Sequence, residues 1–481
     1  MKIKHIIFLY ISINIYLFLP VSVYSQSDSL YNYLEIAAKN NATVMQRFSE
    51  YKAALQKVPQ VGSLSDPELS VGVFLSPMYL MDGRQIADIR LMQMFPWFGV
   101  LKYAKDEMSL MANAKFELFR DAKFQVFYDV QRTYYELYKI ENEISISEKN
   151  IDILKLIERL AIVRYRSPSS AGQENSPSGN PNTQVSSPAG SSSMQATTAS
   201  QPGMSSANSN QSSAVMQRNT MNSATGTSGL VDIYRIQIET GDLENNIALL
   251  RNQQKSITAQ FNSYLNRPVL SPVYNVDNLF PDSLDLSMAS VSDSIHANNP
   301  MLSMLAYEKQ SQEARKKMVI RMGYPMVGLG VNYSIIGITP IPMGYPSMNG
   351  KDMIMPMVVL TLPVYRKKYT AMRNEAELMK EASSENYQAT SNSLQAEYYQ
   401  AVSMYQDAQR RVKLYDRQFQ LASKSFDLIL KDFSTSSSEL TDVLRARQQT
   451  LDYELKKVDA TADFSTAIAW IKRLMATSQM Q

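Results

Sequence analysis

Two pairs of oppositely charged side chains occupy matching positions in the chain. Asp232 is followed three residues later by Arg235, and Asp442 is followed at the same spacing by Arg445. Each aspartate lies near the expected start of a long helix, where unpaired backbone N–H groups and the helix dipole favour a carboxylate. A spacing of three residues also permits an ion pair along the helix. The pattern therefore predicts two charged helix starts.

Methionine is the other residue type whose distribution could indicate a ligand. The chain has 28 methionines, and several gather around two expected strand pairs: Met78, Met81, Met92, Met94, Met343, Met348, Met353, Met355 and Met357. A thioether is a soft ligand that suits Cu(I) or Ag(I), so Met78, Met81, Met343 and Met348 are candidate metal contacts. Methionine also fills gaps in apolar surfaces, and the alternation of Met353, Met355 and Met357 equally suits one lipid-facing side of a strand. The sequence leaves both interpretations open.

Catalytic chemistry is not indicated. After residue 25 the chain has a single histidine, His296, and it has no cysteine, so no histidine metal cluster and no Cys/His or Ser/His constellation is predicted. No glycine-rich phosphate loop occurs. The net charge of +3 is small for this length and does not indicate a nucleic-acid partner. We predict a protein that is not an enzyme and carries no cofactor.

The segment 102–166 has the pattern of a coiled-coil helix. One heptad position carries Phe116, Val130, Leu137, Ile144 and Ile151, and the other carries Phe119, Val126, Ile140, Leu154 and Ala161. Polar residues break the seam at Lys123, Thr133, Ser147 and Glu158, but no proline interrupts it. At about 1.5 Å per residue this helix would run for roughly 100 Å, too long for the core of a globule. It therefore needs long helices beside it, which segments 230–267 and 369–474 supply.

The sequence predicts that one structural unit occurs twice in the chain. Leu230, Asp232, Arg235, Thr240, Asp242 and Glu244 recur at a constant offset of 210 as Leu440, Asp442, Arg445, Thr450, Asp452 and Glu454. Upstream, Ala38-Lys39-Asn40-Asn41 resembles Ala297-Asn298-Asn299-Pro300. Residues 26–270 and 283–481 are therefore two repeats, each expected to contain a helix, two strands, a long helix, a turn and a second helix.

Alternating apolar residues predict two strands in each repeat. The first repeat has Leu69, Val71, Val73 and Leu75, followed by Ile89, Leu91, Gln93 and Phe95. The second has Val327, Leu329, Val331 and Tyr333, followed by the segment 353–362. Beyond residue 25 no apolar run reaches the roughly 18 residues of a membrane-spanning helix. Four strands are too few for a membrane barrel, whose smallest examples have about eight, so several chains would have to share one.

Two segments are expected to lie outside this plan. Lys2 and Lys4 precede an apolar run from Ile6 to Val23, and Ser25 follows at the spacing of a signal-peptidase site, so 1–25 is predicted to be a signal peptide cleaved near Ser25. An N-terminal membrane anchor is the alternative. No cysteine follows that would carry a lipid. The Ser/Asn/Gln/Met-rich segment 167–228 has too little apolar surface to fold and is predicted to be a disordered insertion.

The chain resembles the TolC-like outer-membrane efflux proteins, a family whose members include copper and silver exporters. The resemblance covers about residues 30–474 and rests on the duplicated plan, on Phe95-Pro96-Trp97-Phe98-Gly99 at a strand end, and on the Asp-Val-Leu-Arg-Ala run at 442–446. It implies a mainly α protein with a β-barrel part. Three chains would form one twelve-stranded barrel in the outer membrane of a Gram-negative bacterium, continuous with an α-helical tunnel of coiled-coil helices that crosses the periplasm.

The resemblance also assigns roles to the turns between the long helices. These turns would form the periplasmic tip, where a periplasmic adaptor (membrane fusion) protein docks and the tunnel closes. Asp442 matches an acidic position of the family's aperture, whereas Ser438 and Arg445 stand where some members have arginine and aspartate. Asp232 and Arg235 are their counterparts in the first repeat. Gly229-Leu230-Val231 resembles the usual tip sequence, and Ser436 replaces a frequent tip glycine.

Two functional hypotheses follow. In the first, the protein is a passive duct that exports small molecules or metal ions, working with an adaptor and an inner-membrane pump of the RND type. In the second, it is a periplasm-spanning coiled-coil protein with a structural or interaction role and no channel. Insertion into the outer membrane would separate the two.

Overall fold

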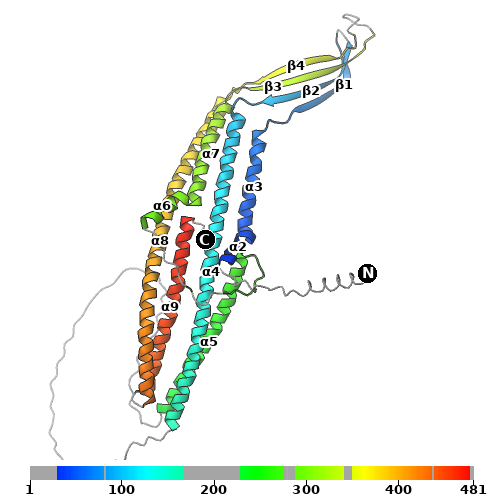
Figure 1. Cartoon of the computed structure of the whole chain (residues 1–481). Helices are drawn as coiled ribbons and strands as arrows, with labels where there is room; N and C mark the ends of the chain where they lie inside the picture. Colours follow the sequence, from blue (N-terminus) through cyan, green and yellow to red (C-terminus); the bar gives the residue numbers. More distant parts are fainter. Residues whose placement is uncertain are drawn as a thin grey trace, which may run out of the picture.

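The computed structural model describes residues 30–80, 83–166, 228–274, 279, 288–340, 349–435 and 438–476. A long helical bundle carries a single curved β-sheet at one end (Figure 1). The predicted signal peptide 1–25, residues 167–227 of the predicted insertion, Met81, Met343, Met348 and Ser436 lie outside the described residues. Within the described part, no helix is both long enough and apolar enough to span a bilayer.

The same series of elements occurs twice along the chain. The first series is α2 (Leu30–Asn40), α3 (Ala42–Gly62), β1 (Glu68–Leu80), β2 (Gly83–Phe95), α4 (Val100–Arg166) and α5 (Ser228–Tyr264). The second is α6 (Met288–Asn298), α7 (Pro300–Met322), β3 (Met326–Gly337), β4 (Met353–Thr361), α8 (Arg366–Ser434) and α9 (Leu440–Met475). The sequence predicted this order except at the start of each series, where the structure has two helices in place of one.

The predicted coiled-coil seam lies along α4, which is 67 residues long. Val130, Leu137 and Leu154 are almost completely buried, which confirms the two heptad positions. Thr133 interrupts the apolar seam yet is also buried, because its hydroxyl donates to the backbone oxygen of Asp129 at 2.6 Å. A hydroxyl that bonds the preceding turn in this way can occupy a buried position without leaving a donor unpaired.

Two shorter helices, α3 and α7, lead to the sheet. The start of α3 lies against the end of α5, and the start of α7 lies against the end of α9. Asn41 precedes α3, and its side-chain oxygen accepts hydrogen bonds from the backbone N–H groups of Thr43 and Val44. Its Nδ2 donates to the backbone oxygen of Tyr264, at the end of α5, at 2.8 Å. One side chain therefore caps one helix and binds the last turn of another.

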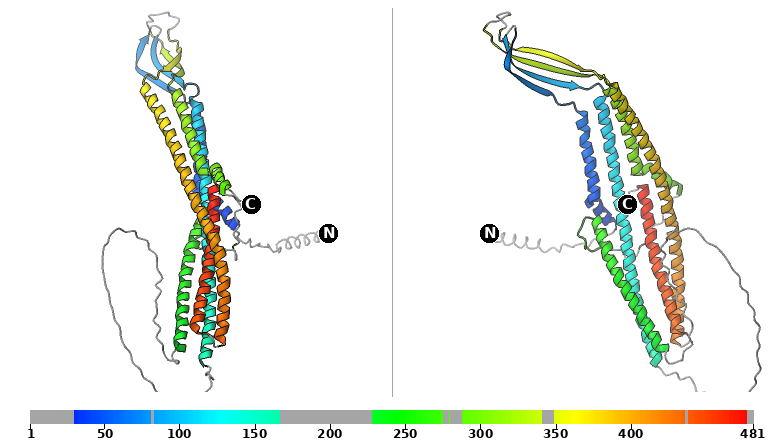
Figure 2. Two further views of the ribbon diagram at one scale, coloured as in Figure 1. Left: turned by 90° about the vertical axis from the view of Figure 1, so that its left-hand side faces the viewer. Right: turned by 180° about the vertical axis from the view of Figure 1, so that it is seen from behind.

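Asn299 repeats this arrangement in the second half. Its side-chain oxygen accepts from Met301 and Leu302, and its Nδ2 donates to the backbone oxygen of Leu474 at 3.2 Å. Asn41 and Asn299 are therefore equivalent. The alignment expected from the sequence, which paired Asn40 with Asn299, was wrong by one residue because backbone geometry defines the cap. With α3 above α5 and α7 above α9, stacked helices accompany α4 and α8 along the bundle (Figure 2).

The four strands form one antiparallel sheet in the order β1-β2-β3-β4. The central pairing, β2 with β3, joins the two halves of the chain and places Leu91 opposite Val331. At the end nearest the helices, every strand is bounded by a nearby proline: Pro67, Pro96, Pro325 and Pro363. Proline cannot donate to a ladder, so these residues define where pairing stops. All four predicted strands are confirmed.

Candidate functional site

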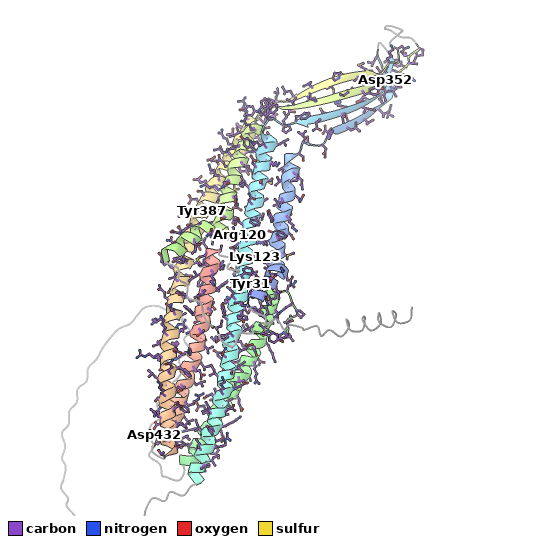
Figure 3. The ribbon with its side chains drawn as sticks, in the orientation of Figure 1. Tyr31, Arg120, Lys123, Asp352, Tyr387 and Asp432 are labelled. Carbon is purple, nitrogen blue, oxygen red and sulfur yellow. The ribbon has the colours of Figure 1, made fainter. Side chains whose placement is uncertain are left out.

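The end of α4 and the start of α5 lie, with the end of α8 and the start of α9, at the end of the bundle opposite the sheet. Figure 3 marks this tip by Asp432, near the end of α8. Arg235 Nη1 lies 3.5 Å from Asp232 Oδ1, and Arg445 Nη1 lies 3.6 Å from Asp442 Oδ1. Both predicted ion pairs therefore form. The Asp442 side chain is 52% exposed and Asp232 is 26% exposed, so the aspartate of the second turn is the more accessible one.

The starts of α5 and α9 contact each other. Arg235 Nη1 also donates to Thr441 Oγ1 at 3.4 Å, across from α5 to α9. Burial raises the pKa of Asp232, Arg235 opposes that rise, and the carboxylate of Glu439 adds to it. Ser438 donates from its hydroxyl to the backbone oxygen of Ile429 at 3.2 Å, which holds the second turn against α8. The predicted tip residues Asp232, Arg235, Ser438, Asp442 and Arg445 therefore lie at one end of the molecule.

Corresponding apolar residues of the two turns differ in exposure. Leu440 is 4% exposed and Val443 is completely buried, in a cluster with Phe433. At the start of α5, Leu230 and Val231 are 48% and 47% exposed. The backbone of Gly229 lies in the first turn of α5. The predicted docking residues Leu230 and Val231 therefore form an accessible apolar pair, whereas Leu440, the counterpart of Leu230, is buried.

A buried arginine lies between the tip and the middle of the bundle. Arg447 of α9 is 7% exposed, and its Nε donates to Asn150 Oδ1 of α4. Its guanidinium carbon lies 5.6 Å from the centre of the Phe426 ring of α8. Burial lowers the pKa of Arg447 below its ordinary value, and Glu454 partly offsets this. Sequence reasoning missed this residue because its partners are distant in sequence and no local spacing identifies them.

The two faces of the sheet differ in chemistry. Directly paired residues of an antiparallel ladder project to the same face, so the register places Val71, Ile89, Tyr333 and Ile354 together. The members of this apolar face are Leu69, Val71, Val73, Ala87, Ile89, Leu91, Gln93, Phe95, Val327, Leu329, Val331, Tyr333, Ile335, Ile354, Pro356, Val358 and Leu360. Many of them are strongly exposed, including Leu69 at 66% and Val358 at 73%. An apolar face this large requires a partner or a lipid environment.

The opposite face is polar and rich in methionine. It carries Glu68, Ser70, Gly72, Gln85, Asp88, Arg90, Gly328, Gly330, Asn332, Ser334, Ile336, Val359 and Thr361, together with Met78, Met92, Met94, Met326, Met353, Met355 and Met357. All seven methionines of the four strands therefore share this face. The expectation that Met353, Met355 and Met357 share one face is confirmed, and the register places Asp88 and Arg90 on that same face. Alternation within one strand shows which of its residues share a face. It does not show which residues of the neighbouring strands lie on that face with them.

Among the predicted metal contacts, Met78 alone lies in the described residues, near the far end of β1 opposite Gln85. In the part of the chain that the structure describes, no three histidine, aspartate or glutamate side chains are grouped as a metal site.

Comparison with known proteins identifies the fold. No protein-family model and no curated protein matches the chain. Solved structures match over nearly its whole length: the CusC channel (TM-score 0.67, 12% identity, 94% of this chain and 92% of that one), the Campylobacter jejuni CmeC outer-membrane channel (0.65, 13%, 93% and 85%) and the Vibrio cholerae outer-membrane protein VceC (0.64, 12%, 92% and 95%). The chain therefore has the fold of the TolC-like outer-membrane efflux channels.

Proposed function

We propose that three copies of this chain form an outer-membrane channel, the exit duct of a tripartite efflux system. The observation that carries the proposal is the division of the sheet into an apolar and a polar face. A closed barrel with lipid outside and water inside needs this division. Four strands per chain supply half of the about eight strands of the smallest membrane barrels, and three chains would supply twelve.

An exposed apolar stripe on α8 supports association of several copies. Leu414, Leu421 and Leu428 are spaced by seven residues and are 43%, 59% and 65% exposed. A heptad stripe of leucines normally packs against another helix. On α5, Tyr234 and Ile238 are similarly exposed, at 61% and 66%. We propose that α8 of one copy packs beside α5 of the next, so that repetition of this contact closes a ring.

The proposal also includes finer features of the channel. The two series of elements represent an internal duplication, comprising residues 26–270 and 283–481. Residues 1–25 direct the chain to the envelope and are removed. Leu230 and Val231 at the tip dock a periplasmic adaptor, which links the duct to an RND-type inner-membrane pump. The predicted insertion at 167–228 connects α4 to α5 in the sequence. The chain itself performs no catalysis, and its duct conducts passively.

Channel formation is tested with the purified full-length protein. We expect heat-resistant trimers in the outer-membrane fraction and discrete conductance steps in planar lipid bilayers. Recovery of a monomer in the periplasmic fraction, with no conductance after reconstitution, would refute the duct and favour the non-channel coiled-coil protein.

Replacing Leu421 with glutamate is expected to prevent trimer formation. Leu421 is the middle residue of the α8 stripe, and a buried carboxylate without a partner is strongly disfavoured at a helix interface. The trimer-to-monomer ratio, measured by native mass spectrometry in detergent, should fall at least about tenfold, which corresponds to about 1.4 kcal/mol. Leu421→Met conserves volume and apolar character and should remain trimeric. An intact Leu421→Glu trimer would place the interface elsewhere.

Replacing Asp442 with alanine is expected to weaken block of the channel by multivalent cations. Three copies of this half-exposed carboxylate would form an acidic ring at the tip, and such rings attract cations. The concentration of hexamminecobalt(III) that halves single-channel current should rise several-fold. Asp232→Ala is the matched control: its carboxylate is more buried, so a smaller change is expected. Identical block in wild type and Asp442→Ala would leave this residue with only its helix-start role.

A further inference from the structure

On the polar face, three methionines flank β3 at a point where this strand carries no side chains. In one row of the sheet, Met92 of β2 and Met357 of β4 are both paired with Gly330 of β3. In the next row, Met94 is paired with Gly328. Alternate strands lie about 10 Å apart. Because glycine leaves the intervening strand uncovered, the side chains from β2 and β4 can meet above it.

The Met94 side chain occupies the space above Gly328. A Cβ atom added at Gly328 would lie only 2.6 Å from the sulfur of Met94. The Met94 side chain therefore extends over β3 toward β4. At Gly330, an added Cβ would lie 3.5 Å from the Cα and Cβ atoms of Met92. The two glycines form the floor of a small cradle bordered by Met92 and Met94 on the β2 side and by Val359 on the β4 side.

A buried polar atom lies beside this cradle. Asn332 is two residues after Gly330 on the same face and is 7% exposed. Its Nδ2 donates to Ser334 Oγ at 3.3 Å, but its Oδ1 is buried and has no hydrogen-bond partner within the described residues. Buried amide oxygens are normally satisfied, so one that is not indicates a missing ligand or water. It offers an oxygen donor next to the sulfur donors.

We propose that Met92, Met94 and Met357, with Asn332 Oδ1 beside them, bind a soft monovalent metal cation of the Cu(I) or Ag(I) type. Thioethers select these ions because both partners are polarisable, whereas Na⁺, K⁺ and Mg²⁺ prefer oxygen ligands. Asp88 and Arg90 on the same face carry opposite charges, so the face has no net positive charge to repel the ion. The proposal rests on the proposed channel function for one point, that this face lines the duct.

Silver binding tests the site directly. The purified full-length protein is titrated with Ag⁺ alone in chloride-free nitrate buffer and followed by calorimetry and by X-ray absorption at the silver edge. We expect about one tightly bound Ag⁺ per chain with sulfur neighbours. The triple variant Met92→Leu/Met94→Leu/Met357→Leu keeps apolar volume and should bind Ag⁺ at least about tenfold more weakly. Met379→Leu, at an exposed methionine of α8 outside the sheet, is the matched control and should bind as wild type does.

The outcomes separate this inference from the proposed channel. Absence of sulfur-ligated Ag⁺ in wild type, or equal binding by the triple variant, would overturn the metal site, and the methionines would be packing residues. Conductance in silver-free buffer reports on the channel independently. A channel that conducts but binds no Ag⁺ refutes only the site, whereas Ag⁺ binding without conductance refutes only the duct. Where the triple variant does not assemble, Met94→Leu alone is used and should also weaken binding.

Discussion

Replacing Asn299 with alanine is expected to destabilise the protein by about 2–4 kcal/mol. Its side-chain oxygen accepts two backbone N–H groups at the start of α7, and loss of such a cap costs about 0.5–2 kcal/mol. Its Nδ2 also satisfies the backbone oxygen of Leu474, and leaving that buried acceptor unpaired costs about 1–3 kcal/mol more. Thermal unfolding followed by helical circular dichroism should show a clear decrease in midpoint temperature.

The neighbouring residue Asn298 is the matched control. Its side chain lies on the surface and donates only to Ser294 Oγ at 3.3 Å, so Asn298→Ala should change stability by less than about 0.5 kcal/mol. Asn299→Asp keeps the cap oxygen but loses the donor, and should lie between the wild type and Asn299→Ala. Equal midpoints for Asn298→Ala and Asn299→Ala would show that the α7–α9 contact contributes nothing. Asn41→Ala should reproduce the effect in the first half.

Replacing Arg447 with alanine is expected to destabilise the tip end of the bundle by about 3 kcal/mol. The substitution removes a side chain buried against Phe426 and leaves a cavity. It also removes the donor to Asn150 Oδ1, which is itself buried. Hydrogen exchange should become faster in the first half of α9 and in the adjoining part of α4, while the sheet is unaffected.

A double substitution distinguishes the polar contact from the packing. Arg447→Met retains most of the volume but leaves the Asn150 amide unpaired, whereas Arg447→Met/Asn150→Leu removes both polar partners. Exchanging a buried polar pair for apolar residues is often neutral or stabilising, so the double variant should recover most of the loss. Arg445→Ala is the surface control, since that side chain is 75% exposed, and it should have little effect. Unchanged exchange in Arg447→Ala would refute its role in joining α9 to α4.

Properties that depend on residues close in sequence followed from the sequence alone. The heptad spacing of α4 predicted its length and its buried side, because an α-helix repeats nearly every seven residues. The ion pairs Asp232–Arg235 and Asp442–Arg445 followed from helical geometry at a spacing of three. Alternation predicted all four strands, and the repeated order of elements predicted which ones correspond. These elements were also sufficient for the resemblance to outer-membrane efflux proteins that the structural comparison supports.

The faces of the sheet were decided by tertiary structure. Alternation shows that Met353, Met355 and Met357 share a side, but the register with β3 and β2 is needed to place Asp88 and Arg90 on that side too. A shift of one residue in register would exchange the faces. The cradle above Gly328 and Gly330 exists only because three strands with distant sequences are aligned in this register.

Contacts between distant helices likewise required the folded chain. Arg447 and Asn150 are separated by 297 positions, and no local pattern relates them. Asn299 can be recognised as a helix cap from its sequence, but its bond to Leu474 depends on α9 ending beside α7. The sequence by itself thus determined the elements and their local pairs, because these depend on repeating backbone geometry. The tertiary structure alone decided which side chains meet, because such meetings depend on how whole elements pack.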